Sequence, residues 1–394
     1  MESIKAIFKI GNGPSSSHTI GPKRAVEDFL SHAPDIDRVR VVLYGSLALT
    51  GRGHLTDRIV SETLGDIPHS VEFDTVTHTP HPNTMLVEGY SGEECVVCTT
   101  YVSIGGGSIV RQGEESSIVH VYPHGTMTEI KAFCAAQGLD LSGYVYHYEG
   151  ESLRQYLYTV ADTMTAAIRR GLASQGKLPG KLSIDRKASR MYRAADTARN
   201  KLYAYAYAVS EENACGGMIV CAPTCGSSGV LPAVMRYSIE QYAIDRDTLA
   251  DGLAVAGLIG NLVKTNASIS GAEAGCQAEI GTACAMAAAY FAYVRGMSTR
   301  HIEQAAEIAL EHHLGLTCDP IFGYVQIPCI ERNAVAAMRA IDAYDLAALL
   351  NPDDERITFD MVCHTMLETG KDLTSLYRET ARGGLAKLYP DDPQ

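Results

Sequence analysis

The chain changes character at residues 152–173, which have the sequence SLRQYLYTVADTMTAAIRRGLA. Apolar residues recur in this stretch at helical spacing, which predicts an amphipathic α-helix. Further Ala-rich stretches with the same spacing follow at 249–263, 281–293, 299–314 and 331–350. The sequence therefore predicts a mostly helical region from about residue 150 onward.

The part of the chain before this region has a different pattern. Residues 39–44, 94–104 and 117–122 are rich in Val, Ile, Thr and Tyr, which are favoured in β-strands. Clusters of Gly and Pro separate these segments. We therefore predict an α+β protein in which a small N-terminal α/β domain, residues 1–148, precedes a larger, mostly α-helical domain, residues 149–394.

Composition narrows the classes of function. The 394 residues are 46% hydrophobic and 20% charged, so the chain has enough apolar surface for a sizeable core. The formal net charge of −13 argues against a protein that binds nucleic acid by general phosphate attraction. The first residues carry no secretory signal pattern, and no run of about 18 apolar residues predicts a membrane span. We expect a cytoplasmic enzyme with no nucleic-acid or membrane partner, whose eleven cysteines are thiols.

Three cysteines of the helical region lie within two residues of a Gly or Pro, where the chain is expected to bend: Cys276, Cys318 and Cys329. Thiolates at such positions suit zinc or an iron–sulfur cluster. The spacing alone matches neither a pair of CxxC knuckles nor a ferredoxin motif, and a free cysteine by default packs as a small apolar residue. Cys95 and Cys98 form the one CxxC of the sequence, and their place in a predicted strand favours a core or surface role over a metal site.

Five segments of the sequence resemble the iron–sulfur-dependent L-serine dehydratases, also called L-serine ammonia-lyases. These segments are GPSSSHTIGPKRA (13–25), LYGSLALTGRGHLTD (43–57), NASISGAEAGCQAEIGTACAMAAA (266–289), EHHLGLTCDPIFGYVQIPCIERNA (311–334) and TGKDLTSLYRETARGGLA (369–386). The similarity covers nearly the whole chain, in the single-chain form of the family. It implies a homodimeric lyase of amino-acid degradation and gluconeogenesis that converts L-serine to aminoacrylate, and hence to pyruvate and ammonia.

The resemblance also implies a cofactor and a set of ligands. A [4Fe–4S] cluster would be held by Cys276, Cys318 and Cys329, and its fourth iron would be open to substrate as a Lewis acid. Some family members place a C-terminal cysteine at that position, whereas this chain ends in YPDDPQ. The extra thiols Cys215, Cys221 and Cys225 lie near these motifs in sequence, and Cys225 stands where many relatives have Asn.

By the same resemblance, His54 is the base that removes the Cα proton of the substrate, since a neutral imidazole suits this task. Substrate contacts are expected at Ser16, His18, Thr19, Asn83 and Lys187. Lys187 fits two interpretations, a cation for the substrate carboxylate and a solvated lysine at a helix start. Because the cysteines and His54 fall in different predicted domains, we expect the active site between the domains.

Three other functions compete with this interpretation. A pyridoxal-phosphate dehydratase would need a Schiff-base lysine, for which Lys187 or Lys264 is available, and a phosphate-binding loop such as Gly105–Gly107. A lyase with the same fold and cluster would eliminate sulfide from cysteine, although the SSSHT and GRGH motifs favour a hydroxy amino acid. An iron–sulfur redox sensor or a structural zinc protein would be expected to supply four thiolates, whereas three fit the pattern.

Overall fold

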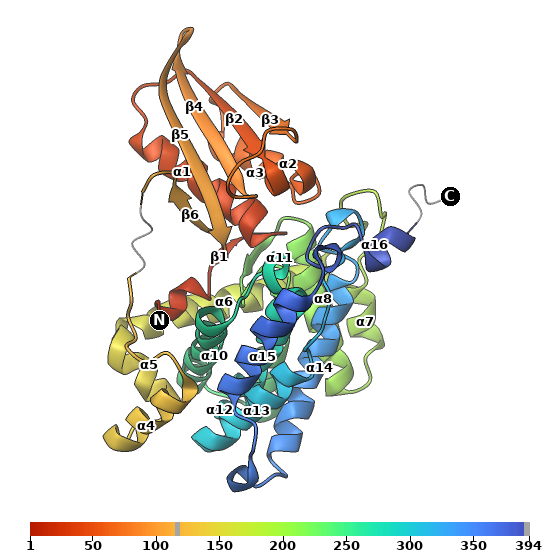
Figure 1. Ribbon diagram of the computed structural model, residues 1–394. Coiled ribbons are helices and arrows are strands. Elements are labelled where there is room, and N and C mark those ends of the chain that lie inside the picture. The colour runs from red at the N-terminus through yellow and green to blue at the C-terminus, as the bar shows by residue number, and fades with distance from the viewer. Residues whose placement is uncertain (115–118, 390–394) are drawn as a thin grey trace. The chain divides into compact units, whose positions relative to one another are not determined.

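The computed structural model describes residues 1–114 and 119–389, and it confirms the α+β class (Figure 1). The chain divides into two compact units. The smaller unit is Asn12–Ile118, and the larger unit combines Met1–Gly11 with Val119–Gln394. In the described residues, none of the helices has both the length and the apolar character needed to span a membrane.

A five-stranded sheet of order β3-β2-β4-β5-β6 is the frame of the smaller unit. Its strands are β2 (Arg38–Tyr44), β3 (His69–Asp74), β4 (Thr84–Ser91), β5 (Glu94–Gly105) and β6 (Ser108–Arg111). β2 and β3 are parallel, and the other neighbouring strands are antiparallel. The register places Val41 between Val71 of β3 and Val87 of β4, so β-branched side chains pack side by side on the sheet.

Two helices of the smaller unit, α1 (Gly21–His32) and α3 (Thr56–Leu64), pack on this sheet. The shared core includes Val26, Phe29, Val39, Val41, Leu43, Val60 and Leu64. Two further helical segments, the π-helix η2 (Ser16–Ile20) and α2 (Gly45–Thr50), carry residues of the predicted substrate and base motifs.

The larger unit is mostly helical. Its α-helices are α4 (Met127–Gln137), α5 (Leu141–Glu149), α6 (Ser152–Ala173), α7 (Ala188–Ala194), α8 (Ala198–Ala214), α9 (Val230–Tyr242), α10 (Arg246–Asn266), α11 (Gly271–Ala274), α12 (Thr282–Val294), α13 (Thr299–Glu311), α14 (Cys329–Ala347), α15 (Phe359–Asp372) and α16 (Gly384–Leu388). Its shorter elements are η1 (Ile4–Ala6), η3 (Gln277–Gly281), η4 (Ile321–Gly323), η5 (Pro352–Asp354), η6 (Ser375–Tyr377), β1 (Ile10–Asn12) and β7 (Met218–Val220), and β1 pairs with β7.

The alanine-rich helix α12 is the central element of the larger unit. It contacts α9, α10, α13 and α14, and every residue of α12 except Tyr293 is buried. Small residues permit this close packing. A Cβ atom at Gly260 of α10 would lie 2.8 Å from the sulfur of Met286, so a side chain there would require the methionine side chain to shift.

Most of the predicted elements are confirmed. α6 spans the predicted stretch 152–173, and α10, α12, α13 and α14 occupy the other four helical stretches. The strands predicted at 39–44 and 94–104 are β2 and β5. The third predicted strand, 117–122, is wrong in its described part: residues 117 and 118 lie outside the described residues, and residues 119–122 are not in a strand. The N–H groups of Val121 and Tyr122 instead donate to the carbonyl oxygen of Met1, at 2.8 and 3.0 Å.

The compact units differ from the predicted domains, which meet at residue 148. Helices α4 and α5 belong to the larger unit, where α5 packs on α10 and the N–H of Met127 donates to Asp360 Oδ1 at 2.8 Å. The first eleven residues also belong there. The side chains of Ile4 and Phe8 pack so closely on Gly257 of α10 that a Cβ atom at that glycine would lie 2.9 and 2.8 Å from them.

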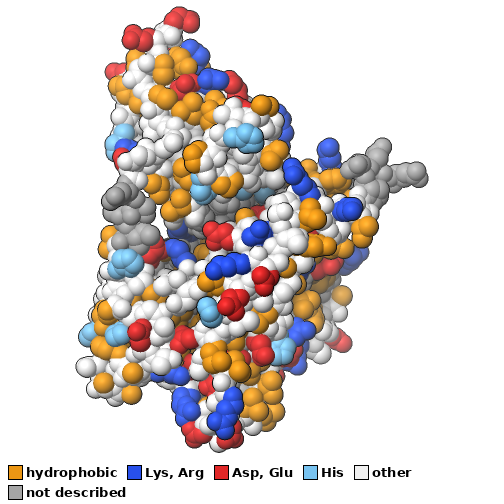
Figure 2. Space-filling view, in the orientation of Figure 1, with side chains coloured by type: hydrophobic (Ala, Val, Ile, Leu, Met, Phe, Trp, Pro, Cys, Tyr) orange, Lys and Arg blue, Asp and Glu red, His pale blue; other side chains and the backbone are white. Residues whose placement is uncertain are grey.

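Acidic and basic side chains are interspersed on the face of the molecule shown in Figure 2.

Candidate functional site

Two of the three cysteines predicted as ligands lie at the starts of helical segments of the larger unit, and the third lies in a loop. Cys276 immediately precedes η3, Cys318 lies in the loop between α13 and η4, and Cys329 is the first residue of α14. Gly275, at a φ of +74°, ends α11 and thereby turns the chain into Cys276. The exposed fractions of the three cysteines are 2%, 4% and 8%, so all three thiols are removed from bulk water.

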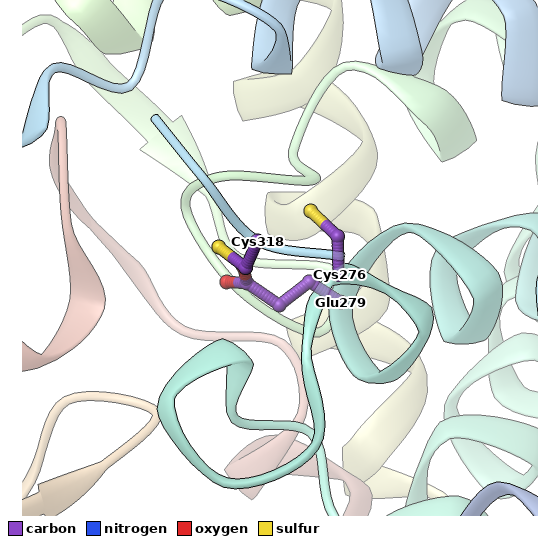
Figure 3. Close-up of side chains that lie close together, drawn as sticks. All are labelled: Cys276, Glu279 and Cys318. Carbon is purple, nitrogen blue, oxygen red and sulfur yellow. The ribbon is translucent and has the colours of Figure 1, made fainter. Parts of the chain in front are cut away.

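Two of these thiols converge with a carboxylate. The sulfur atoms of Cys276 and Cys318 and a carboxylate oxygen of Glu279 all lie within 4.8 Å of one another, close enough to share a metal ion. Figure 3 shows the Glu279 carboxylate beside the sulfur of Cys318. Motif reasoning did not single out Glu279, although its position three residues after Cys276 on a helical segment was a usable signal.

The electrostatics of these groups reflect mutual proximity and burial. A hydrogen bond with Cys276, together with burial, raises the pKa of Cys318 well above its usual range. Burial and the nearby Cys276 raise the pKa of Cys329. Burial also raises the pKa of Glu279, against the opposing effects of the Thr224 hydroxyl and Arg332. Without a cation, burial therefore works against the charged forms of these thiols and of the Glu279 carboxyl group.

Arg332 is a nearby positive charge. It lies three residues after Cys329, makes a side-chain hydrogen bond with Cys276, and donates from Nη1 to the carbonyl oxygen of Thr317 at 2.6 Å. Its Nη2 lies 3.7 Å from Asp319 Oδ1. Arg332 thus ties the loop of Cys318 to the start of α14, where Cys329 is located.

A segment near the C-terminus is hydrogen-bonded to the same loop. The N–H of Cys318 donates to the carbonyl oxygen of Tyr377 at 2.7 Å, and the N–H of Glu379 donates to the carbonyl oxygen of Cys318 at 2.9 Å. Glu379 has a left-handed backbone, with φ of +56°. Burial and the carboxyl group of Glu279 raise the pKa of Glu379 to about 8. Residues 377–379 therefore add a second carboxyl group to the surroundings of the cysteines.

The extra thiols occupy other positions. The sulfur atoms of Cys221 and Cys225 lie 3.4 Å apart in the buried segment after β7, and neither belongs to the group formed by Cys276, Glu279 and Cys318. Cys215 is half-buried. Cys95 and Cys98 are both exposed on β5, which matches the surface role, one of the two roles expected for them.

The predicted base and its neighbour come together in the smaller unit. The rings of His54 and His18 lie 4.6 Å apart between centroids, and the two residues are 2% and 3% exposed. His18 Nδ1 lies 2.9 Å from Ser17 Oγ, and His18 Nε2 lies 3.0 Å from Ser46 Oγ. Burial lowers the pKa of His18 to about 4, while burial and the adjacent His18 hold the pKa of His54 well below its usual range. Both imidazoles are therefore neutral at pH 7.

The hydrogen bonds of His54 identify which ring nitrogen carries its proton. His54 Nδ1 lies 3.2 Å from Thr50 Oγ1, and Thr50 Oγ1 donates its one hydrogen to the carbonyl oxygen of Ser46 at 2.9 Å. Thr50 can therefore only accept at His54, so the proton is assigned to Nδ1. Within the described residues, His54 Nε2 has no hydrogen-bonding partner, and its lone pair is available as a base.

The hydroxyl groups predicted to contact substrate divide into two kinds. Thr19 Oγ1 donates to the carbonyl oxygen of His54 at 2.9 Å and accepts from the N–H of Ser15, so this side chain supports the base. Ser16 is buried at the start of η2, and within the described residues its hydroxyl makes no protein hydrogen bond. The Ser16 hydroxyl is therefore free to bind a ligand.

Asn83 lies near the same motif. Its Nδ2 donates to the carbonyl oxygen of Ser103 at 3.4 Å, and the hydroxyl of Ser103 donates to the carbonyl oxygen of Ser17 at 2.8 Å. Asn83 Oδ1 is buried without a protein partner among the described residues. A buried amide oxygen in this state favours binding of a ligand donor such as an ammonium or hydroxyl group.

Lys187 occupies the N-cap position of α7 in the larger unit. Its backbone N–H donates to Glu211 Oε1 at 2.6 Å. Among the described residues, no hydrogen bond or ion pair joins its side chain to the three cysteines. The helix-start interpretation of Lys187 thus matches its place in the fold, and a substrate role stays a prediction.

The sequence matches two family models. The model of the serine dehydratase beta chain matches residues 3–79, and that of the serine dehydratase alpha chain matches residues 85–386. The chain is 41% identical to L-serine dehydratase 2 of Escherichia coli (strain K12), with 98% of each chain covered. It is 39% identical to the L-serine dehydratase of Haemophilus influenzae, over 98% of this chain and 99% of that protein, and 39% identical to the L-serine dehydratase of Streptomyces coelicolor, over 98% of each.

Proposed function

The chain belongs to the serine dehydratase family and is an L-serine ammonia-lyase, and from this premise we propose that it works with a [4Fe–4S] cluster held by Cys276, Cys318 and Cys329. The reaction removes water from L-serine to give aminoacrylate, which tautomerises and hydrolyses to pyruvate and ammonia. It needs a base for the Cα proton and assistance for the departure of hydroxide, which is a poor leaving group.

The residues around the cysteines fit such a cluster. Three buried thiols and the carboxyl groups of Glu279 and Glu379 share a region in which burial disfavours their charged forms. A positively charged metal group favours thiolates and carboxylates and so offsets this penalty. Thiolates are also the ligands that iron–sulfur clusters use. This convergence of buried thiols with half-buried carboxyl groups is the single observation that carries the proposal.

When bound, the cluster would supply a Lewis acid at the iron without a thiolate, to polarise the substrate carboxylate and hydroxyl. The protein itself supplies the base. We assign the removal of the Cα proton to the Nε2 lone pair of His54, because the ring is neutral at pH 7 and Thr50 holds the proton on Nδ1.

The neighbours of His54 hold it in place. Thr19 bonds the carbonyl oxygen of His54, and Thr56 Oγ1 donates to the carbonyl oxygen of His18 at 2.6 Å. The side chains of Ser16, His18 and Asn83 are assigned to substrate binding, in which the free Ser16 hydroxyl and the unpaired Asn83 Oδ1 are the open polar groups.

The same resemblance supports a cytoplasmic homodimer with no nucleic-acid or membrane partner. Size-exclusion chromatography with light scattering tests the dimer, since a monomeric mass at working concentration would contradict it.

The test of the proposed function is a pyruvate assay on L-serine with protein that is purified and handled without oxygen, combined with an absorption spectrum. We expect turnover together with a broad shoulder at the edge of the visible region that disappears in air. A pyridoxal-phosphate band, or a colourless protein with full activity, would contradict the cluster proposal.

A further inference from the structure

The carboxylate of Glu279 is held in place between two glycines. A Cβ atom at Gly271 would lie 2.8 Å from Glu279 Oε2 and 3.3 Å from the sulfur of Cys318. A Cβ atom at Gly226 would lie 3.3 Å from Glu279 Oε1. The absence of side chains at both positions leaves room for this carboxylate beside the cysteine, and the Thr224 hydroxyl adds a hydrogen bond to it.

The same carboxylate lacks a cation in direct contact. Among the described residues, Glu279 takes part in no ion pair within 4.0 Å, and Arg332 acts on it only at longer range. Glu279 is half-buried, and this burial disfavours its charged carboxylate unless a metal ion or another charge compensates it. Its oxygen instead lies within 4.8 Å of the sulfur atoms of Cys276 and Cys318, the distance range in which three groups can share one metal centre.

The coordination chemistry leaves one place for such an oxygen. Fe–S clusters of the [4Fe–4S] type are usually held by four cysteines, whereas three are assigned here. We propose that Glu279 binds the iron without a thiolate through one carboxylate oxygen in the substrate-free enzyme, and that the carboxylate of L-serine displaces it. This inference rests on the proposed cluster. In the exchange one Fe–O bond breaks and another forms, and one carboxylate replaces another, so no electron is transferred and the charge on the iron site is unchanged.

Glu379 is the alternative carboxylate, and the geometry favours Glu279. A Glu279 oxygen lies within 4.8 Å of the sulfur atoms of both Cys276 and Cys318, and no such approach to both is found for Glu379 among the described residues. Its position is also tied to the backbone, because its N–H donates to the carbonyl oxygen of Cys318.

The variant Glu279→Gln tests the proposal, with Glu379→Gln and the exposed Glu273→Gln as matched controls. If Glu279 occupies the iron for all but about one tenth of the time, substrate finds the iron open only in that tenth. The apparent affinity for substrate is then about tenfold weaker than the affinity of the open site. Glu279→Gln should therefore lower the KM for L-serine about tenfold, whereas a merely structural role of Glu279 would raise KM. The fourth iron should also leave faster in air, seen by electron paramagnetic resonance as quicker appearance of a three-iron cluster.

A second measurement needs no variant at position 279. Wild-type holoenzyme labelled with ¹³C-glutamate, and reduced to its paramagnetic state, should show a ¹³C hyperfine coupling from a carboxylate in electron–nuclear double resonance. The coupling should persist in labelled Glu379→Gln and disappear when L-serine is added.

The outcomes separate this inference from the proposed function. Absence of the coupling, or an unchanged KM and an unchanged rate of iron loss in a Glu279→Gln protein with normal cluster content, would overturn the role of Glu279 and leave the cluster in place. Loss of the coupling in Glu379→Gln would move the role to Glu379 and overturn the proposal. Wild-type protein that takes up no iron and sulfide would overturn both.

Discussion

Replacing Thr50 by Val removes the hydroxyl that holds the proton of His54 on Nδ1. The His54 Nδ1 to Thr50 Oγ1 contact is 3.2 Å, and both residues are neutral. A neutral hydrogen bond of this kind contributes about 0.5–1.5 kcal/mol net, which corresponds to a factor of roughly 2 to 13 in the ratio of the two tautomers. The Nε2–H tautomer has its lone pair on Nδ1, facing α2, and is not competent as the proposed base.

We therefore expect Thr50→Val to shift the tautomer ratio toward Nε2–H by roughly 2- to 13-fold and to lower kcat/KM by up to the same factor. The assay is ¹⁵N NMR of protein labelled at histidine, in which His54→Ala assigns the resonances of His54 among the thirteen histidines. Thr50→Ser is the matched control, since it keeps the hydroxyl and should keep the Nδ1–H tautomer.

Two results would refute this reasoning. In the first, Thr50→Val keeps the proton on Nδ1, which means that the hydroxyl does not decide the tautomer. In the second, the tautomer shifts but kcat/KM is unchanged, which means that the Nε2 lone pair is not the base.

Three further predictions concern the same residues and the helix packing. His54→Ala should lower kcat about 10²- to 10⁴-fold with an unchanged cluster spectrum, and a variant that turns over near the parent rate would exclude His54 as the base. His18→Ala should instead raise KM more than it lowers kcat. Burial lowers the pKa of His18 from 6.5 to about 4, so as pH falls the unfolded chain protonates this imidazole before the folded protein does. The free energy of unfolding should therefore decrease by about 3 kcal/mol in all as pH falls from 6.5 to 4. Urea unfolding at pH 7 and pH 4.5 measures this loss, and His18→Gln should flatten the pH dependence. Gly171→Ala should destabilise the larger unit by about 3 kcal/mol or more, because the new Cβ atom would lie 2.1 Å from the carbonyl oxygen of Ala208. The control is Gly176→Ala, in which the new Cβ atom meets nothing within 4 Å. Because the φ of Gly176 is +95°, this control should cost only the backbone strain of about 1–2 kcal/mol.

Local periodicity predicted the helices well because their apolar faces are long and regular. The stretch 152–173 became α6 with the predicted bounds, and α12 lies within a residue of its own. Periodicity carries no information on which distant segments pack together. It therefore assigned residues 1–11 and helices α4 and α5 to the first domain, whereas contacts such as Phe8 with Gly257 place them in the larger unit.

The candidate site was predictable only where a motif marked it. The five segments pointed to Cys276, Cys318 and Cys329, and the structure places the first two beside each other. Glu279 was missed because a glutamate on a helical segment is usually a solvated residue. Only the fold shows that two glycines from elsewhere in the chain enclose its carboxylate.

Thr19 shows a related limit of the sequence argument. Its hydroxyl lies in the motif expected to contact substrate, but in the structure it donates to the carbonyl oxygen of His54. Thr50, to which we assign control of the His54 tautomer, lies within the segment 43–57, but the motif does not single it out. A side chain that acts by positioning another is identified by its hydrogen bonds, and these depend on tertiary structure.

The most direct test of the cluster proposal is the iron and acid-labile sulfide content of the protein purified without oxygen, with Cys318→Ala measured beside Cys98→Ala. Cys98 is exposed on β5 and lies outside the candidate site, so its variant controls for loss of a thiol as such. We predict about four iron and four sulfide per chain for the wild type and for Cys98→Ala, and loss of both the cluster and pyruvate formation in Cys318→Ala. Full iron content and full activity in Cys318→Ala, or turnover of L-serine by a wild-type protein without iron, would contradict the account.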